Sequence, residues 1–123
     1  MTDKEFADVI AMSEGYCKIL AVLIPKVRQG TATPAELEAY GQAVSGLAGY
    51  RDQMAKGIAE TWGRYDIMVA LVARLPGSGP ALVPVLNDLR DLARFKILDE
   101  PASRPLWQPR LQQIEWHLSQ WGR

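Results

Sequence analysis

A chain of 123 residues has the usual length of a single domain and can bury a hydrophobic core without disulfide bonds. Apolar residues make up 48% of the chain and charged residues 23%, a globular composition that argues against disorder. The 14 basic and 14 acidic side chains cancel, so the chain lacks the basic excess of most nucleic-acid-binding domains. We therefore expect one domain over residues 1–123, and the charge balance disfavours a nucleic-acid partner.

The first predicted helix begins after a cap at Thr2 or Asp3 and ends before Gly30. Its apolar side chains recur at three- and four-residue steps and form one continuous face. This face comprises Phe6, Val9, Ile10, Ser13, Tyr16, Cys17, Leu20, Leu23, Ile24 and Val27. A second stripe beside it comprises Met12, Tyr16, Ile19 and Leu23. Two adjoining stripes need neighbours on more than one side, so we expect this helix at the centre of the bundle, with a subunit interface as the alternative.

Cys17 is the only cysteine of the chain and lies on that apolar face. A free cysteine there is usually a small buried hydrophobe, whereas a catalytic thiolate needs an exposed, electropositive site. The lack of paired cysteines fits a reducing compartment. The N-terminus lacks the cationic start and apolar run of a signal peptide, and residues 19–24, the longest apolar stretch, are too few to cross a bilayer. We therefore expect a cytoplasmic protein without a membrane partner.

The second predicted helix opens with Thr33-Pro34-Ala35-Glu36, a capping box with proline at the first helical position. An apolar seam with a period of 3.5 residues, typical of left-handed supercoiled packing, follows it. The seam comprises Leu37, Tyr40, Val44, Leu47, Arg51, Met54, Ile58, Thr61, Tyr65, Met68, Val72 and Leu75. Because the seam is unbroken, we expect one helix over residues 34–75, continuous or mildly bent, with a break near Gly57 or Gly63 as the alternative. A continuous helix would be about 60 Å long at a rise of 1.5 Å per residue, so a second copy of the chain would have to cover part of the seam.

Arg51 stands at a seam position where an aliphatic residue is expected. We expect its side chain to reach water at the end of the bundle. The alternative is a carboxylate from another helix or subunit, which would fix the register of the two elements and make Arg51 a partner contact.

The segment 75–80 is rich in proline and glycine and ends the second helix. A third helix is predicted from Ser78 to about Leu98. Residues 101–109 contain three prolines and are predicted to form an ordered loop before a short final helix. The apolar face of that helix, with Trp107 in its lead-in, comprises Leu111, Ile114, Leu118 and Trp121. The fold class is therefore all-α, a bundle of four or five helices with one long central helix.

Trp116 lies about half a turn away from this apolar face, at roughly 100° per residue. It shares its side of the helix with polar, uncharged residues, among them Gln112 and Gln120. Tryptophan is among the residues most enriched at binding hot spots. Either the final helix is covered on both faces, or Trp116, Gln112 and Gln120 contact a partner; we take these three residues as the candidate partner contact.

Metal and cofactor motifs are missing from the chain. His117 is the only histidine, and neither Cys-x-x-Cys nor His-Glu-x-x-His spacing occurs. The Gly-Ser-Gly-Pro at 77–80 lacks the lysine and Ser/Thr of a phosphate-binding loop. We therefore expect no metal, no cofactor and no catalytic residue.

One pair of residues suggests an alternative. Arg110 and His117 lie two turns apart on one flank of the last helix. Arginine can stabilise phosphate charge, and histidine can act as a general acid or base. The pair resembles the Arg-x(4–6)-His signature of HEPN-type helical ribonucleases, although Leu111 stands where a polar residue often follows that arginine. The resemblance covers only these two residues and implies a phosphodiester-cleaving enzyme or an RNA-binding helical domain.

Taken together, the patterns favour protein–protein contact over chemistry. We predict a non-enzymatic adaptor, regulator or assembly factor that binds another protein and self-associates as a homo-oligomer through its second helix. The HEPN-like activity of Arg110 and His117 is the alternative.

Overall fold

The structure confirms the all-α bundle that the periodicity predicts. It is a computed structural model that describes residues 1–122. The α-helices of these residues are α1 (Asp3–Gln29), α2 (Pro34–Glu60), α3 (Arg64–Arg74), α4 (Val83–Asp99) and α5 (Arg104–Trp121). Two short 3-10 helices, η1 (Gly79–Leu82) and η2 (Pro101–Ser103), lead into α4 and α5.

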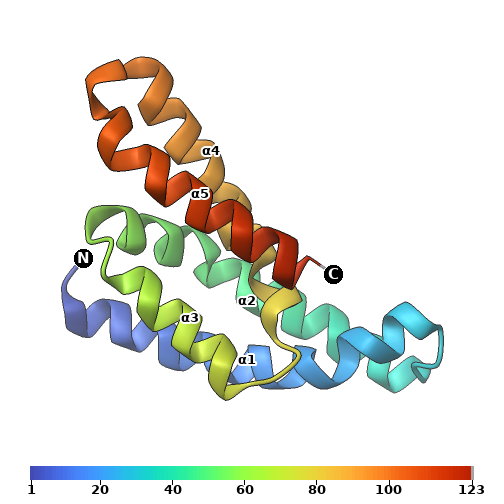
Figure 1. Cartoon of the computed structure of the whole chain (residues 1–123). Coiled ribbons are helices and arrows are strands. Elements are labelled where there is room, and N and C mark those ends of the chain that lie inside the picture. The colour runs from blue at the N-terminus through green and yellow to red at the C-terminus, as the bar shows by residue number, and fades with distance from the viewer. Residues whose placement is uncertain (123) are drawn as a thin grey trace.

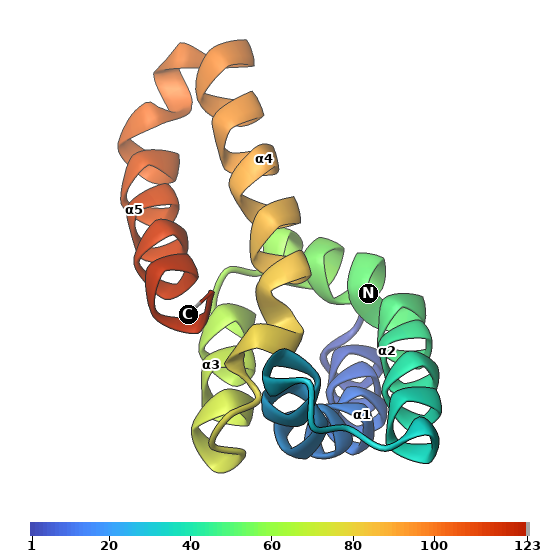
Figure 2. The ribbon, with the colours of Figure 1, turned by 90° about the vertical axis from the view of Figure 1, so that its right-hand side faces the viewer.

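The helices form two hairpins with α3 beside the first (Figure 1). The helices α1 and α2 pack along their lengths, and α4 and α5 do the same. The second hairpin is anchored on α2 at the start of α4, and its far end at η2 stands clear of α1, α2 and α3 in both views (Figures 1 and 2). Across residues 1–122, no helix combines the length and the hydrophobicity needed to cross a membrane.

Capping boxes start the two longest helices. The Thr33 hydroxyl accepts from the Glu36 amide at 3.1 Å, and the Glu36 carboxylate accepts from the Thr33 amide at 3.1 Å, as predicted. Thr2 caps α1 in the same way. Each cap stabilises its helix by about 1 kcal/mol. Gly30, in the left-handed region at φ 71°, ends α1 and turns the chain into α2.

The second predicted helix is broken. Since α2 ends at Glu60 and α3 begins at Arg64, the expectation of one helix over residues 34–75 is wrong, and the alternative break near Gly63 is correct. Thr61, at a seam position, is extended (φ −139°, ψ 99°) and stops α2. Met54 and Ile58 before the break and Tyr65 and Met68 after it remain in the core, but α3 turns back beside α1 instead of projecting.

Contacts of the buried Arg64 side chain hold this break in place. Its guanidinium donates to the Gly57 carbonyl at 2.9 Å and to the Met1 carbonyl at 3.0 Å, and it pairs with the Asp3 carboxylate at 2.9 Å. These bonds join the start of α3 to the end of α2 and to the start of α1. A hydrogen bond between segments about sixty residues apart leaves no trace in helical periodicity, which explains the error.

The last helix is longer than expected. Residues 101–109 were predicted to form a loop, but α5 begins at Arg104. Pro105 lies in the first turn, where its missing N–H has no intrahelical acceptor. Pro109 lies inside α5 and removes one backbone hydrogen bond, while the neighbouring Trp107 is buried in the core.

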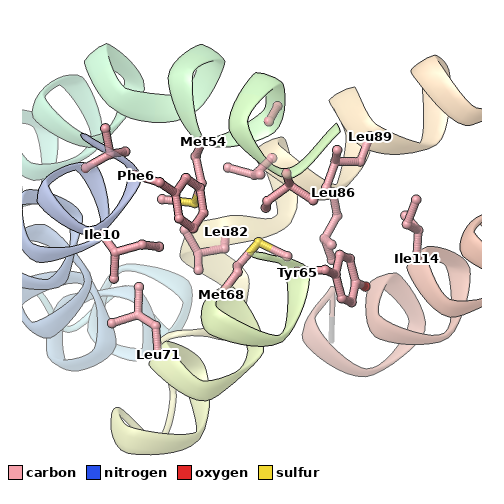
Figure 3. Close-up of a cluster of buried hydrophobic side chains, with 14 of the residues drawn as sticks. Phe6, Ile10, Met54, Tyr65, Met68, Leu71, Leu82, Leu86, Leu89 and Ile114 are labelled. Carbon is pink, nitrogen blue, oxygen red and sulfur yellow. The ribbon is translucent and has the colours of Figure 1, made fainter. Parts of the chain in front are cut away.

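One hydrophobic core joins all five α-helices (Figure 3). Its buried side chains include Phe6, Ile10, Cys17 and Leu20 of α1, Met54 and Ile58 of α2, Tyr65, Met68 and Leu71 of α3, Leu86 and Leu89 of α4, and Ile114 of α5. Leu82 of η1 is buried among them. The core therefore runs from the α1–α2 hairpin through α3 into the base of the second hairpin.

The first helix lies at an edge of the bundle, so the expected central position is wrong. Its predicted apolar face is largely buried, but Met12 and Ile19 of the second stripe are exposed. The neighbours α2, α3 and η1 cover only one side of α1.

Candidate functional site

Arg51 joins α2 to α4. Its Nε and Nη2 donate to the two carboxylate oxygens of Asp88 at 2.8 and 2.6 Å, a bidentate pair. This hydrogen bonding raises the pKa of Arg51. The alternative, a carboxylate from another helix, is correct, and the Arg51 side chain is also 45% exposed to water while it binds that carboxylate. Because the pair is half exposed, its main effect is on register, with a free-energy contribution of about 1 kcal/mol at most.

An apolar groove, which we call the α1–α2–α4 groove, begins at Arg51. It is lined by Leu20 and Ile24 of α1, by Tyr40, Val44, Leu47, Ala48 and Arg51 of α2, and by Pro80, Ala81, Pro84 and Val85 of η1 and α4. Apart from Tyr40 and Arg51, every one of these side chains is apolar. The floor on the α2 side is the N-terminal part of the predicted seam.

The groove exists because the seam is covered over only part of its length. Beyond Arg51, the seam residues Met54 and Ile58 are fully buried. Before Arg51, Val44 is 43% exposed and Leu37 is exposed as well. A seam with a period of 3.5 residues matches a second helix packed along it. In the N-terminal half of α2, α1 packs beside the seam and buries Leu47 but leaves Leu37 and Val44 exposed. Ala48 also lines the groove, and its small side chain leaves space above α2.

The size and chemistry of the groove indicate its ligand class. Its cavity volume is about 240 Å³, below the roughly 300–1,000 Å³ of a typical small-molecule site. The Pro80 and Pro84 walls have no backbone N–H, so they cannot pair with an extended peptide strand. The lining of the groove can pack against large apolar side chains.

His117 is buried in an aromatic cluster, which consists of Trp62, Tyr65, Trp107, Trp116, His117 and Trp121. Its Nδ1 lies 2.7 Å from the Tyr65 hydroxyl and 3.1 Å from the Gln113 carbonyl. Burial lowers the pKa of His117, against the smaller opposing effect of the Gln113 carbonyl. The imidazole ring also contacts Trp116 and Trp121 at centroid distances of 4.9 and 4.8 Å. This environment favours the neutral ring and covers much of it.

Arg110 contacts the other side of the same cluster. Its guanidinium carbon lies 4.7 Å from the Trp107 ring centroid and 5.0 Å from that of Trp62. Such cation–π contacts stabilise by about 0.5–1 kcal/mol at partly exposed sites. Burial lowers the pKa of Arg110. The two residues of the ribonuclease-like pair therefore have different aromatic partners, Arg110 on Trp62 and Trp107 and His117 on Tyr65.

Trp116 is 60% exposed, and Gln112 and Gln120 are exposed on the same helix. The final helix is therefore not covered on both faces, and a partner contact at Trp116 stays a prediction. The Trp116 indole is perpendicular to the His117 ring, at an interplanar angle of 87°, so one side of the indole contacts the imidazole and the rest is open to solvent. The structure does not bring Arg51 to this face, because Arg51 is bound to Asp88 on the α2–α4 side.

Cys17 is buried as expected. Burial, and to a smaller extent the charge of Glu14, raises the pKa of the Cys17 thiol to about 11. The protonated thiol is a poor nucleophile. Among residues 1–122, no three His, Cys, Asp or Glu side chains gather in a group that could hold a metal ion.

The groove combines segments of α1, α2, η1 and α4 that are far apart in the sequence. Leu20 and Ile24 were assigned to the core, and Pro80 and Pro84 to a turn and a helix start. The signal in the sequence that could have indicated the groove was the α2 seam, because it is longer than any one neighbouring helix can cover. No protein-family model, curated protein or solved structure matches this chain.

Proposed function

We propose that this protein is a non-enzymatic, cytoplasmic interaction module that binds an amphipathic helix of another protein in the α1–α2–α4 groove. The observation that carries the proposal is the incompletely covered N-terminal part of the α2 seam, where Val44, 43% exposed, lines an apolar cavity. Helix-in-groove recognition uses apolar anchors at positions i, i+3 or i+4, and i+7 of the bound helix. The 3.5-residue spacing of the seam matches that pattern.

The site chemistry supports binding over catalysis. The two side chains of the ribonuclease-like pair are engaged with aromatic rings, and burial lowers the pKa of His117, which reduces the protonated fraction available to a general acid. The protonated, buried Cys17 thiol is likewise unsuited to nucleophilic catalysis. An unpaired cysteine fits a reducing compartment.

A selection from a library of phage-displayed peptides tests the proposal, with the whole protein as bait. We expect selected peptides to carry apolar residues at helical spacing and to become helical on binding by circular dichroism. Val44→Glu places a charge in the groove and should weaken their binding at least tenfold. Ile67→Glu is the matched control, because Ile67 on α3 is 44% exposed, like Val44, but lies outside the groove.

Two outcomes contradict the proposal. One is a selection that yields only extended or proline-rich peptides. The other is equal binding by wild type, Val44→Glu and Ile67→Glu, with all three proteins showing the same thermal unfolding.

A further inference from the structure

Arg110 of α5 differs from most arginines of the bundle because it has no carboxylate partner. Five arginines pair with a carboxylate at distances between 2.6 and 3.6 Å, namely Arg51, Arg64, Arg74, Arg90 and Arg94. Among residues 1–122, no carboxylate oxygen lies within 4 Å of the Arg110 guanidinium, and no residue accepts a hydrogen bond from it. Since a guanidinium remains charged at neutral pH, Arg110 is a half-buried cation without a counter-ion in this part of the chain.

Two indole rings hold the Arg110 side chain in one position. Its guanidinium carbon lies over the Trp107 and Trp62 rings, and these two rings are inclined at 75° to each other. The guanidinium can therefore turn a face to one ring and one edge to the other. A guanidinium has five N–H donors in its plane, so a further N–H edge stays available to an acceptor outside the bundle.

The pKa values of two arginines show what a counter-ion contributes. Burial lowers the pKa of Arg110, whereas hydrogen bonding to Asp88 raises the pKa of Arg51. An oxyanion at the free edge of Arg110 would replace lost hydration and form two parallel charge-assisted hydrogen bonds, as carboxylates and phosphates do with arginine. Because the rings already restrict the side chain, little further conformational entropy is lost on binding.

The residues around Arg110 indicate what carries the oxyanion. Leu106, one turn before Arg110 on the same flank of α5, is 54% exposed, and the Trp62 ring is only partly buried. Gln113, one turn after Arg110, has a side-chain amide without a hydrogen-bond partner among residues 1–122. Both apolar surface and a second polar donor therefore lie next to the guanidinium.

We propose that Arg110 binds a single oxyanion, a carboxylate or phosphate group, whose apolar or aromatic body packs against Leu106 and Trp62. One unpaired arginine fits one oxyanion, whereas a nucleic-acid strand is held through several phosphates at once. None of these residues lines the α1–α2–α4 groove, so the oxyanion site is independent of the function proposed for that groove.

Titration of the ¹⁵N-labelled protein with benzoate and with phenyl phosphate, followed by NMR, tests the proposal. We expect the Arg110 Nε–H signal and the Trp62 and Trp107 indole N–H signals to shift along one saturation curve. Acetate and inorganic phosphate should bind several times more weakly, because they lack the apolar body. Tighter binding of benzoate would identify a carboxylate as the preferred group and tighter binding of phenyl phosphate a phosphate, and either result agrees with the proposal.

Variants of two arginines on α5 separate a specific site from general charge. Arg110→Gln should abolish binding, and Arg110→Lys should weaken it at least fivefold, because an ammonium group cannot form the forked pair. Arg110→Lys keeps a cation beside the rings and gives a result even if Arg110→Gln does not fold. Arg104→Gln is the matched control and should bind as the wild type does. Arg104 is exposed, also has no carboxylate within 4 Å among residues 1–122, and lies about 120° around the helix from Arg110.

Three results overturn the proposal. The first is a wild-type Arg110 signal that does not shift at high millimolar concentrations of benzoate and phenyl phosphate. The second is an equal loss of affinity in Arg104→Gln and Arg110→Gln, which would show unspecific attraction to positive charge. The third is a single-stranded oligouridylate that binds more tightly than phenyl phosphate and loses affinity in both variants, because this would show a nucleic-acid surface with several phosphate contacts.

Discussion

The Tyr65 hydroxyl lies 2.7 Å from Nδ1 of His117 and joins α3 to α5 across the buried interface between them. Tyr65 is fully buried, and burial raises the pKa of its hydroxyl, which therefore remains protonated. The Trp62 ring stacks on the Tyr65 ring at a centroid distance of 4.8 Å. The residue that resembled a catalytic histidine is thus a contact between two helices, and its titration should affect stability.

The free energy of unfolding should fall as the pH is lowered below about 6.5. Burial lowers the pKa of His117 in the folded protein, whereas the unfolded chain has the ordinary value near 6.5. Below that value the unfolded chain binds more protons than the folded one, so stability is complete above pH 6.5 and is lost as the pH falls through the folded pKa. Urea unfolding at pH 7.5, 6.5 and 5.5 measures this effect. His117→Gln should remove most of the dependence in this window, and an equal slope in the variant would contradict the assignment.

Arg64→Ala should destabilise the protein by about 2–3 kcal/mol, because it leaves the Gly57 and Met1 carbonyls without their buried donor. Arg64→Lys should restore only part of this loss, since a single ammonium group cannot reproduce the forked geometry. Urea unfolding gives both values. Arg74→Ala is the control: Arg74 is half exposed and lies 3.6 Å from Glu14, so its loss should cost no more than about 0.5 kcal/mol. Equal losses at the two positions would show that Arg64 does not hold the α2–α3 break.

The Arg51–Asp88 pair should show a small coupling energy. A double-mutant cycle with Arg51→Ala and Asp88→Ala should give about 1 kcal/mol or less, because both side chains are partly exposed. Thermal or urea unfolding of the four proteins measures the coupling. A value several times larger would mean that the pair stabilises the anchoring of α4 on α2 far more than its exposure suggests.

Cys17 should be unreactive in the folded protein. Its thiol is fully buried, and burial raises its pKa to about 11, so little thiolate exists at neutral pH. Labelling with Ellman's reagent should be slow in buffer and rapid in 6 M guanidinium chloride. Rapid labelling of the native protein would indicate that α1 opens locally.

Local signals allowed much of the fold to be predicted. The Thr33 capping box acts within one turn, so residues 33–36 alone determine the start of α2. The break at Thr61 depends on contacts between distant segments, such as Arg64 with the Met1 carbonyl. Those contacts override a continuous seam, and periodicity carries no information about them. The early start of α5 is local, because a first helical turn tolerates Pro105.

The candidate sites were predictable to a smaller extent. The seam of α2 and the exposed position of Trp116 follow from helical spacing, but the walls of the groove come from three segments that meet only in the folded chain. The second stripe of α1 was recognised, yet whether Met12 and Ile19 were covered depended on where the other helices pack. Arg110 and His117 matched a motif in spacing, while Trp62 and Tyr65, which contact them, lie in the α2–α3 turn and in α3.

The groove takes its walls from both hairpins, so its width depends on how the second hairpin is anchored on α2. A ligand held between Val44 of α2 and Pro84 of α4 would bind only one arrangement of the two hairpins. Its binding would therefore stabilise that arrangement against opening, and the melting temperature should rise with ligand concentration.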